Sequence, residues 1–386
     1  MKKIGIVCCA TALLLVFAHC AKKDGSYATM KKINGQEVVV CDVTTVTDTT
    51  PTPLSTIVSS CELIRPQATA ESLMKSPLHI DVSDNYLLIK SYGDIPVKLF
   101  SREGEFLRDI GQLGRGPGEY GALYGVQLDE ARNRIYLTPF ANADRVLVYD
   151  MEGQHLPSIP LKYPQAKTKV YVNGNTVTVL GMRFDNNHPF AYQQTAEGEV
   201  IGEAPVLDHF FVARDFNNEI SSGRNAGAFD MFVLDWYRNT PDTLYHYNTA
   251  ANVLEPRFVL EGKPIADLKD NVYENPVASV HELKGHYHAM ISGPDYFKRI
   301  IVEKETLKAR HFKILNDFYC DIELTNLFSA NDGIFISSIP AIRLMEHLEH
   351  LLENDNLEDE KRREAVQLLD SLDENDNDII FVGEMI

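Results

Sequence analysis

Two pairs of histidines have a spacing that metal sites use. His286 and His288 fall on one face of an expected strand, and His347 and His350 lie one turn apart on an expected helix. Imidazoles at such spacings can share a zinc ion. The segment from His281 to His286 is one residue too long for the H-E-x-x-H motif, and a solvated acidic helix explains the second pair as well. We therefore predict no metal site and no cofactor.

The segment from Asp373 to Glu384 nearly matches a calcium-binding loop. Positions 1, 3, 5 and 12 of such a loop are filled by Asp373, Asn375, Asn377 and Glu384. Position 6 requires glycine for a sharp turn, and here it is Asp378. We therefore predict a polar turn that binds calcium weakly or not at all.

A glycine-rich segment contains a formal G-x-G-x-x-G match at Gly116, Gly118 and Gly121. A dinucleotide site needs a helix directly after this motif, because the N-terminus of that helix holds the pyrophosphate. Strand-like sequence follows here, so we interpret the segment as a rigid link between two repeats. No G-x-S-x-G, P-loop or C-x-x-C motif is present, and we assign no catalytic residues.

Aromatic and arginine side chains are the remaining candidates for contacting a ligand. Trp236, the single tryptophan, and Tyr237 have the shape to stack on a sugar ring, although packing between repeats is the favoured explanation for both. Arg214 and Arg224 belong to a long connection between the third and fourth repeats. Long loops on a rigid scaffold often carry binding residues. These four residues are the predicted contacts for a hydroxyl-rich or anionic ligand.

The elements that position these side chains repeat along the chain. A strand, a tight turn and a second strand recur with turn positions at Gly104, Gly153, Gly198, Ala251 and Thr306, which lie 45 to 55 residues apart. Two more strand-like segments precede the turn in each of the clearer repeats, with Asn or Asp in the turns between them. Four short strands in a repeat of this length indicate the blades of a β-propeller.

The last repeat is interrupted by a helical pattern. Asp321–Leu324 and Ile334–Ser338 are expected as its first two strands. Apolar residues then recur at three- and four-residue steps, which predicts a helical hairpin at 341–374 with an acidic outer face. The sequence returns to a strand pattern at Ile379–Ile386, and this leaves the blade one strand short.

The missing strand is expected to come from the N-terminal part of the chain. Leu54–Ile64 has a strand pattern and no other partner, and its pairing with Ile379–Ile386 would remove an exposed sheet edge. The predicted fold is therefore an all-β, six-bladed β-propeller over residues 54–386, with the helical hairpin inserted in the last blade.

The first residues are typical of an exported lipoprotein. Two lysines precede an apolar stretch that is too short for a comfortable membrane span, so residues 1–19 are predicted to be a signal peptide. Cys20 follows where bacterial lipoproteins carry their lipid, although His19 is larger than the residue usual before that cysteine. Residues 20–53 end in a run of Thr and Pro, and we predict a lipid-anchored flexible tether there.

Composition narrows the classes of partner. The 386 residues include 55 acidic and 37 basic side chains, for a net charge of −18, so nucleic acid is an unsuitable partner. Anionic membranes would also repel this surface, which leaves the lipid as the means of attachment. Of the six cysteines, Cys41, Cys61 and Cys320 remain in the expected mature domain, and unpaired thiols are favoured over a disulfide with one thiol left over.

The sequence GQLGRGPGEY at Gly111–Tyr120 resembles a motif of the six-bladed β-propeller lipoproteins of Bacteroidetes, which are similar to NHL- and TolB-type propellers. The resemblance covers the whole mature chain. It implies a place in the envelope of a Gram-negative bacterium, on the periplasmic face or the cell surface. It also implies carbohydrate utilisation, with a glycan or outer-membrane uptake proteins as partners.

Two classes of function follow. The favoured one is a ligand-binding or scaffold lipoprotein with no enzymatic activity. The alternative is a propeller hydrolase or lyase with its site at the central channel. Such an enzyme would gather paired carboxylates or a histidine-rich metal site there.

Overall fold

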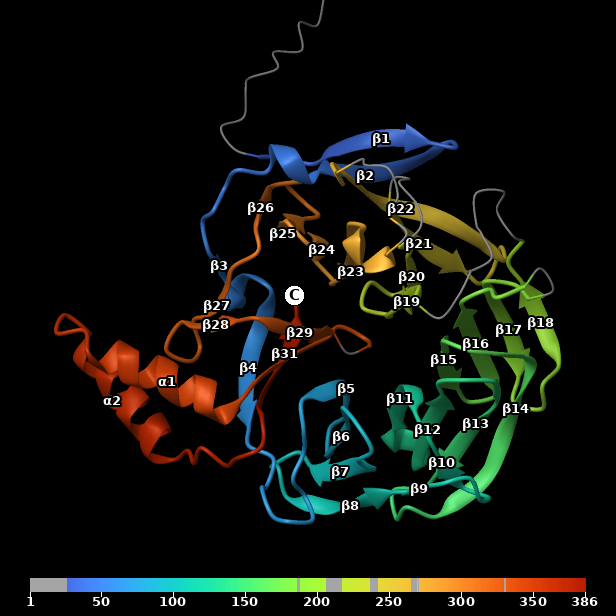
Figure 1. Ribbon diagram of the computed structural model, residues 1–386, viewed down its shortest axis with the longest axis horizontal. Helices are drawn as coiled ribbons and strands as arrows, with labels where there is room; N and C mark the ends of the chain where they lie inside the picture. Colours follow the sequence, from blue (N-terminus) through green and yellow to red (C-terminus); the bar gives the residue numbers. More distant parts are fainter. Residues whose placement is uncertain are drawn as a thin grey trace, which may run out of the picture.

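The computed structural model describes residues 26–386 apart from 186–187, 206–216, 237–241, 265–268, 270 and 330. Within these residues the chain is built from β-strands, four short 3₁₀ turns and two α-helices. Figure 1 shows the sheets side by side around a common centre, which is the arrangement of a β-propeller. The predicted fold class is confirmed at this level.

Six sheets have four strands or more. The first three contain β5 (Pro77–Val82), β6 (Tyr86–Ser91), β7 (Val97–Ser101) and β8 (Phe106–Ile110); β11 (Leu123–Asp129), β12 (Arg134–Pro139), β13 (Ala143–Tyr149) and β14 (His155–Gln165); and β15 (Thr168–Asn173), β16 (Thr176–Gly181), β17 (Ala191–Thr195) and β18 (Val200–Glu203). The next three contain β19 (Glu219–Ser221), β20 (Phe229–Leu234), β21 (Asp242–Asn248) and β22 (Val253–Glu261); β23 (Val277–Glu282), β24 (His286–Gly293), β25 (Tyr296–Glu303) and β26 (Ala309–His311); and β29 (Asn326–Ser329), β30 (Ile334–Ile339), β31 (Ile379–Met385) and β4 (Val58–Ile64).

The number of blades differs from the prediction. A further sheet is formed by β28 (Ile322–Leu324), β27 (Ile314–Asn316) and β3 (Thr52–Pro53), so that counting this three-stranded sheet gives seven blades and not six. The sequence assigned Asp321–Leu324 to the first strand of the last blade. Those residues pair instead with β27, and β29 takes the place next to β30. Short strands of three residues carry too little alternation to reveal their partner from sequence.

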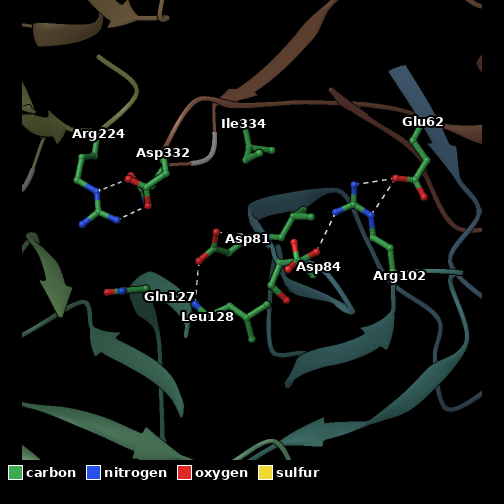
Figure 2. Close-up of a pocket in the computed structure, with 12 residues that line it drawn as sticks. Glu62, Asp81, Asp84, Arg102, Gln127, Leu128, Arg224, Asp332 and Ile334 are labelled. Atoms are coloured by element: carbon green, nitrogen blue, oxygen red, sulfur yellow. Dashed lines mark hydrogen bonds and ion pairs between the residues drawn. The ribbon is translucent and has the colours of Figure 1, made fainter. Parts of the chain in front are cut away.

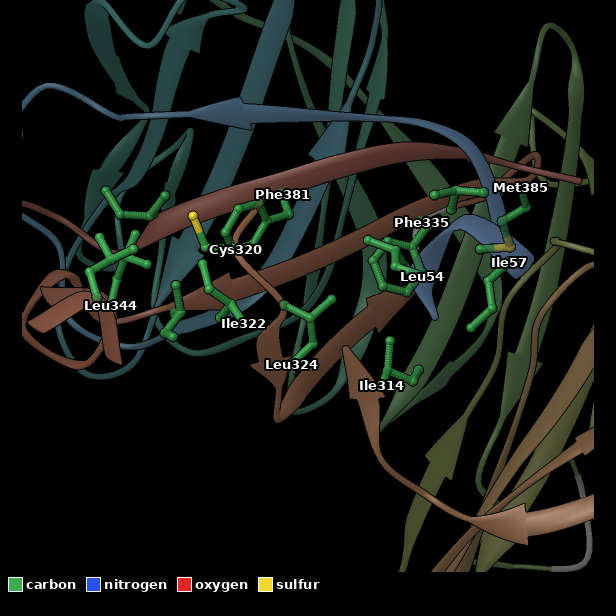
Figure 3. Packing of buried hydrophobic residues seen from close by; sticks show 14 of the residues in the cluster. Leu54, Ile57, Ile314, Cys320, Ile322, Leu324, Phe335, Leu344, Phe381 and Met385 are labelled. Carbon is green, nitrogen blue, oxygen red and sulfur yellow. The ribbon is translucent and has the colours of Figure 1, made fainter. Parts of the chain in front are cut away.

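The strand β4 closes the sheet of β29, β30 and β31. It pairs antiparallel with β31, with Ile64 opposite Ile380, which confirms the expected pairing of the N- and C-terminal segments. Figure 3 shows side chains from both segments in one apolar cluster, including Leu54 and Phe381. Both are fully buried. The pairing therefore removes a sheet edge and buries apolar area at the same place.

The flexible tether predicted for residues 20–53 is wrong for its described part, residues 26–53. Here β1 (Thr29–Ile33) and β2 (Gln36–Asp42) form a hairpin, and β2 pairs in parallel with β22, so that Val40 lies opposite Val259. Figure 1 shows this hairpin as the outermost layer of the β19–β22 blade. The buried side chains Val38 and Cys41 explain why the segment packs against the blade, because burying them removes apolar surface from water.

Two helices lie between β30 and β31. These are α1 (Ala341–Leu352) and α2 (Asp359–Asp370), and they contact each other. Leu344, Leu348 and Ala365 are buried in the same cluster as Phe381. The helices thus cover the outer part of the closing blade (Figure 1). Among the described residues, no helix has the length and apolar character needed to cross a membrane.

The glycine-rich link joins the first two blades. It holds β9 (Gln112–Leu113) and β10 (Glu119–Tyr120), which pair in parallel, and β11 follows directly without a helix. The Tyr120 hydroxyl donates to the Ile110 carbonyl at 2.7 Å and accepts from the Val97 amide at 2.8 Å. A Cβ on Gly111 would come within 2.7 Å of the Tyr149 hydroxyl. The link is therefore a structural joint, as the sequence predicted.

Candidate functional site

The first strand of each large blade lines the centre of the ring. A cavity of about 260 Å³ is bounded by residues of β5, β11, β15, β19, β23 and β29, and we call it the channel cavity. Three basic side chains, His79, Lys169 and His281, line it together with a single acid, Asp81. Apolar side chains such as Val126 and Leu327 line the rest of the cavity.

A larger cavity of about 510 Å³ opens where these inner strands end, and we call it the mouth cavity. It shares Asp81, Gln127 and Asn331 with the channel cavity. Figure 2 shows Arg224 and Asp332 facing each other on one side of it. The lining is mostly polar or charged, and the described lining residues include no aromatic ring: Glu62, Asp81, Val82, Ser83, Asp84, Arg102, Gln127, Leu128, Arg224, Asn331, Asp332 and Ile334. A volume of this size suits a small ligand.

The connection from β19 to β20 fixes Arg224. The Gly223 amide donates to Asp230 Oδ1 at 2.7 Å, and the Ser222 hydroxyl donates to the Asp230 carbonyl at 2.6 Å. Arg224 then forms a two-pronged ion pair with Asp332 of the β29–β30 connection. The Asp332 carboxylate remains largely exposed, so it can also accept hydrogen bonds from a ligand.

Asp81 lies at the end of β5, between the two cavities. Its Oδ2 accepts a hydrogen bond from the Leu128 amide at 2.8 Å, and its Oδ1 accepts from the Val82 amide at 3.1 Å. Burial raises the pKa of Asp81 to about 6, and the charge of Asp332 raises it further, while these two amides and Arg224 oppose the shift. This carboxyl group therefore gains or loses its proton close to neutral pH.

A second pair of charges forms the opposite side of the mouth. Arg102 donates to Glu62 at 2.7 Å (Figure 2). It also donates to the Ser83 carbonyl at 3.1 Å. The mouth thus presents a guanidinium and a carboxylate on each side. Such a set offers both donors and acceptors to a polar ligand.

Buried acids lie behind the Arg224 connection. Burial raises the pKa of Asp230 to about 8, with a further contribution from the charge of Glu282. For Glu282 burial also opposes ionisation, but hydrogen bonds and positive charge from His246 and Lys304 lower its pKa. Asp230 is therefore neutral near pH 7, whereas Glu282 stays ionised within its ion pairs.

The predicted ligand contacts fall in different places. Arg224 lines the mouth cavity. Trp236 does not: its indole nitrogen donates to the Asn217 carbonyl at 3.0 Å, and its ring meets Tyr273 edge to face at 5.5 Å. This contact agrees with the packing explanation of Trp236. Tyr237 and Arg214 lie outside the described residues, as does the predicted lipid site at Cys20.

The sequence placed Arg224 in a connection between the third and fourth repeats. Arg224 lies instead within one blade, between β19 and β20, because Glu219–Ser221 forms the inner strand of the fourth large sheet. Asn225 then bridges to neighbouring elements, donating to the Glu282 carbonyl at 3.4 Å and accepting from the Gly333 amide at 3.3 Å. The short inner strand explains why the sequence did not reveal it.

The histidine pairs do not assemble a metal site among the described residues, where no group of three metal-binding side chains occurs. His288 packs on Phe312, with ring centres 4.5 Å apart, and stacks with His281 at 6.0 Å. His286 lines a separate small cavity. His347 contacts the Cys320 carbonyl at 3.1 Å.

The calcium-like segment has a structural use. Asn377 is buried and its side chain holds the loop before β5: it accepts from the Met74 amide at 2.7 Å and donates to the Gln67 carbonyl at 2.8 Å. This supports the interpretation as a polar turn. The three cysteines Cys41, Cys61 and Cys320 are free, as expected.

Sequence reasoning missed most of the site. Asp81, Gln127, Lys169 and Asp332 were not singled out, although three of them lie in strands that the repeat pattern placed correctly. The available signal was a charged or amide residue inside the first strand of successive repeats. In a propeller that strand lines the axis, so charge there marks the channel.

Comparisons with known proteins place the chain in a family and support its fold. The sequence profile of a family described as a domain of unknown function, DUF4934, matches residues 38–384. A protein of Bacteroides fragilis that is proposed to be exported has a TM-score of 0.60 at 17% identity, with 87% of this chain and 98% of that protein covered. No curated protein matches the sequence.

Two further solved structures are more distant. A protein of unknown function from Bacteroides thetaiotaomicron has a TM-score of 0.41 at 12% identity, covering 81% of this chain and 79% of its own. A Thermus thermophilus protein proposed to be an oxidoreductase (glucose dehydrogenase) has a TM-score of 0.39 at 12% identity, covering 85% and 100%. Neither score supports an argument about function. The profile match spans most of the sequence, and the chain therefore belongs to the DUF4934 family.

Proposed function

We propose that this protein is an extracytoplasmic binding propeller that receives a small polar ligand at the mouth cavity. The observation that carries the proposal is the pairing of Arg224 with the exposed Asp332 carboxylate beside the buried Asp81. A ring of strands holds these groups rigidly, so little conformational entropy is lost when a ligand binds.

The ligand class that fits the mouth is hydroxyl-rich. Guanidinium and carboxylate groups together hydrogen-bond vicinal hydroxyls, with the guanidinium donating and the carboxylate accepting. A carbohydrate meets this description, in agreement with the glycan use implied by the sequence resemblance. Because the described lining holds no aromatic ring, recognition there would rest on hydrogen bonds and not on stacking.

The proposal includes a location in the cell envelope. The signal-like residues 1–19 and the cysteine at position 20 support export and lipid attachment. The Bacteroides fragilis protein with the same fold, which is itself only proposed to be exported, is consistent with this placement. Replacing Cys20 with Ser should release the protein from membranes into a soluble envelope fraction. Unchanged membrane fractionation would reject the anchor without affecting the binding site.

The binding proposal is tested on a glycan array followed by calorimetry. Arg224→Gln should abolish binding of a selected glycan, because it removes the guanidinium and unpairs Asp332. Arg145→Gln is the matched control, since Arg145 pairs with Asp144 on the exposed surface. Binding that survives Arg224→Gln but fails in Trp236→Ala would move the site to the surface around Trp236.

A second function, a propeller hydrolase or lyase, is favoured by one observation. The pKa of Asp81 is raised to about 6 by burial, and such a carboxyl group can serve as an acid or a base near neutral pH. Product release from a bound glycan that disappears in Asp81→Asn would establish this function. Binding without any product supports the binding role.

A further inference from the structure

The channel cavity has an unusual charge balance for a protein this acidic. Its described lining contains three basic side chains and one acid, on strands from different blades: His79 on β5, Lys169 on β15 and His281 on β23, with Asp81 at the end of β5. The basic groups thus converge from separate directions. They share one cavity at the centre of the ring.

The two imidazoles have no hydrogen-bond partner within the described part of the chain. His281 makes only a ring contact, with His288. Lys169 donates one hydrogen bond, to the Tyr124 carbonyl at 3.0 Å, and lies over the Tyr124 ring at 4.3 Å. An ammonium group has three donors, so Lys169 retains capacity for another acceptor.

We infer that the channel cavity binds the oxyanionic group of a small acidic ligand, such as a carboxylate or a phosphate, between His79, Lys169 and His281. The inference rests on the proposed function, because the channel and mouth cavities share lining residues and one ligand can occupy both. The anionic end then lies in the channel, and hydroxyl groups lie at the mouth.

Electrostatics supports this assignment. Burial lowers the pKa of His79 to about 3, and the charge of Lys169 adds to the effect. Desolvation by the surrounding protein and the charge of Lys169 lower the pKa of His281 to about 4, although this side chain is exposed to solvent. Burial also lowers the pKa of Lys169 to about 8, against the opposing charge of Glu219. Each basic group therefore lacks sufficient negative charge nearby. An oxyanion placed among them would raise all three pKa values and be held more tightly as the pH falls.

The other charged side chains near the three basic groups already have partners within the protein. Glu219 accepts from the Tyr124 hydroxyl at 2.6 Å and pairs with Lys167. Lys90, opposite His79 on β6, donates to the Gly93 and Ile95 carbonyls at 3.0 and 2.8 Å. On the His281 side, Arg299 lies over the Phe312 ring at 3.9 Å and donates to the Thr325 carbonyl at 3.1 Å.

The Asp81 carboxylate already accepts two backbone amides. It is also the acid that an incoming oxyanion would meet. Protonation of Asp81 near its raised pKa of about 6 removes that repulsion, so it strengthens oxyanion binding in the same direction as the basic groups do.

Calorimetry with inorganic sulfate tests the site, because sulfate keeps its charge between pH 5 and 9. Sulfate should bind the full mature protein, and its affinity should fall as the pH rises through 8. Lys169→Met should weaken binding about tenfold or more. His79→Asn and His281→Asn should weaken it less. The matched controls Lys32→Met and His350→Asn alter exposed residues on β1 and α1, and they should leave sulfate binding unchanged.

Comparing the affinities of phosphate and glucuronate with that of sulfate identifies which kind of molecule carries the oxyanion. Tighter glucuronate binding that also depends on Arg224 indicates an acidic sugar that spans both cavities. Tighter phosphate binding that is independent of Arg224 indicates a free phosphate group. Either result supports the site if Lys169→Met abolishes it.

Three results would overturn the inference. The first is no binding of sulfate, phosphate or glucuronate up to about 10 mM. The second is binding that Lys169→Met leaves intact. The third is an acidic sugar, such as glucuronate, whose binding depends on Arg224 but not on Lys169, which would preserve the proposed function. Should the variants fold poorly, the imidazole resonances of the unaltered protein answer the same question. At about pH 5, close to their lowered pKa values, those of His79 and His281 must move toward the protonated form when sulfate is added, while no such sulfate-dependent change is expected for His350.

Discussion

The closing blade and the central channel are built from opposite kinds of side chain. In the closing blade, Leu54, Phe335 and Phe381 from three distant parts of the sequence pack in one apolar cluster (Figure 3). In the channel, His79 and Lys169 face open space. The difference shows that the contacts within and between blades hold the ring together. Inner-strand positions are thereby free to carry polar and basic side chains, which would be costly in a packed core.

The largest loss of stability is expected when a side chain is removed from the apolar cluster of the closing blade. Phe381→Ala should lower the free energy of unfolding by about 4 kcal/mol, because the lost ring leaves a cavity in a fully buried position. Chemical denaturation measures this change. Phe297→Ala is the matched control on an exposed ring and should change stability by less than about 0.5 kcal/mol. Equal effects in the two variants would mean that the cluster does not hold the blade.

A second variant tests whether the N-terminal hairpin belongs to the fold. Val38 is fully buried against Val259, so Val38→Ala should cost about 2 kcal/mol of unfolding free energy. The partly exposed Val366 on α2 provides the control Val366→Ala. If Val38→Ala proves neutral in the same denaturation assay, residues 26–53 behave as the tether that the sequence predicted.

Asp230, the buried acid behind the mouth cavity, should make the free energy of unfolding depend on pH. The folded-state pKa of Asp230 is about 8 and lies above its unfolded value, so the folded protein holds a proton that the unfolded chain releases. The resulting stability is fully present below the unfolded pKa and is lost as the pH rises through 8. Relative to Asp230→Asn, the unaltered protein should therefore lose about 1.4 kcal/mol or more between pH 5 and 8. Asp355→Asn, on an exposed loop, is the control. A difference that stays constant over this range would show that Asp230 titrates normally.

The smallest stability effect is expected at the mouth itself. Arg224→Gln should change the free energy of unfolding by less than about 1 kcal/mol, because its partner Asp332 is largely exposed. The same variant should abolish ligand binding, so function and stability would separate at this residue. If Arg224→Gln fails to fold, the Arg224–Asp332 ion pair is needed for the stability of the fold.

The overall architecture followed from the sequence because repetition is a signal that single elements lack. Strand hairpins at regular intervals predicted a propeller, and the leftover strand at Leu54–Ile64 predicted the closing pair with β31. The seventh sheet was missed because its strands β27, β28 and β3 are each two or three residues long. The hairpin of β1 and β2 was missed because its partner, β22, lies some 200 residues away along the chain.

The site was harder to predict for a physical reason. Arg224 was selected for its place in a presumed loop, and it does line the mouth, whereas Asp332 and Lys169 belong to other blades. A channel brings together one residue from each repeat, so its members are separated by the full repeat length and form no local motif. Trp236 drew attention by its chemical type alone, and its contacts are those of packing.

The central claim is that a ligand binds in the mouth and channel cavities, and the position of a bound ligand tests this most directly. A crystal structure of the protein with a glycan or acidic sugar selected by the binding screen should show the ligand between Arg224 and Asp81, with any oxyanionic group directed at Lys169. Ligand density over Trp236, with the mouth and the channel empty, would contradict the account.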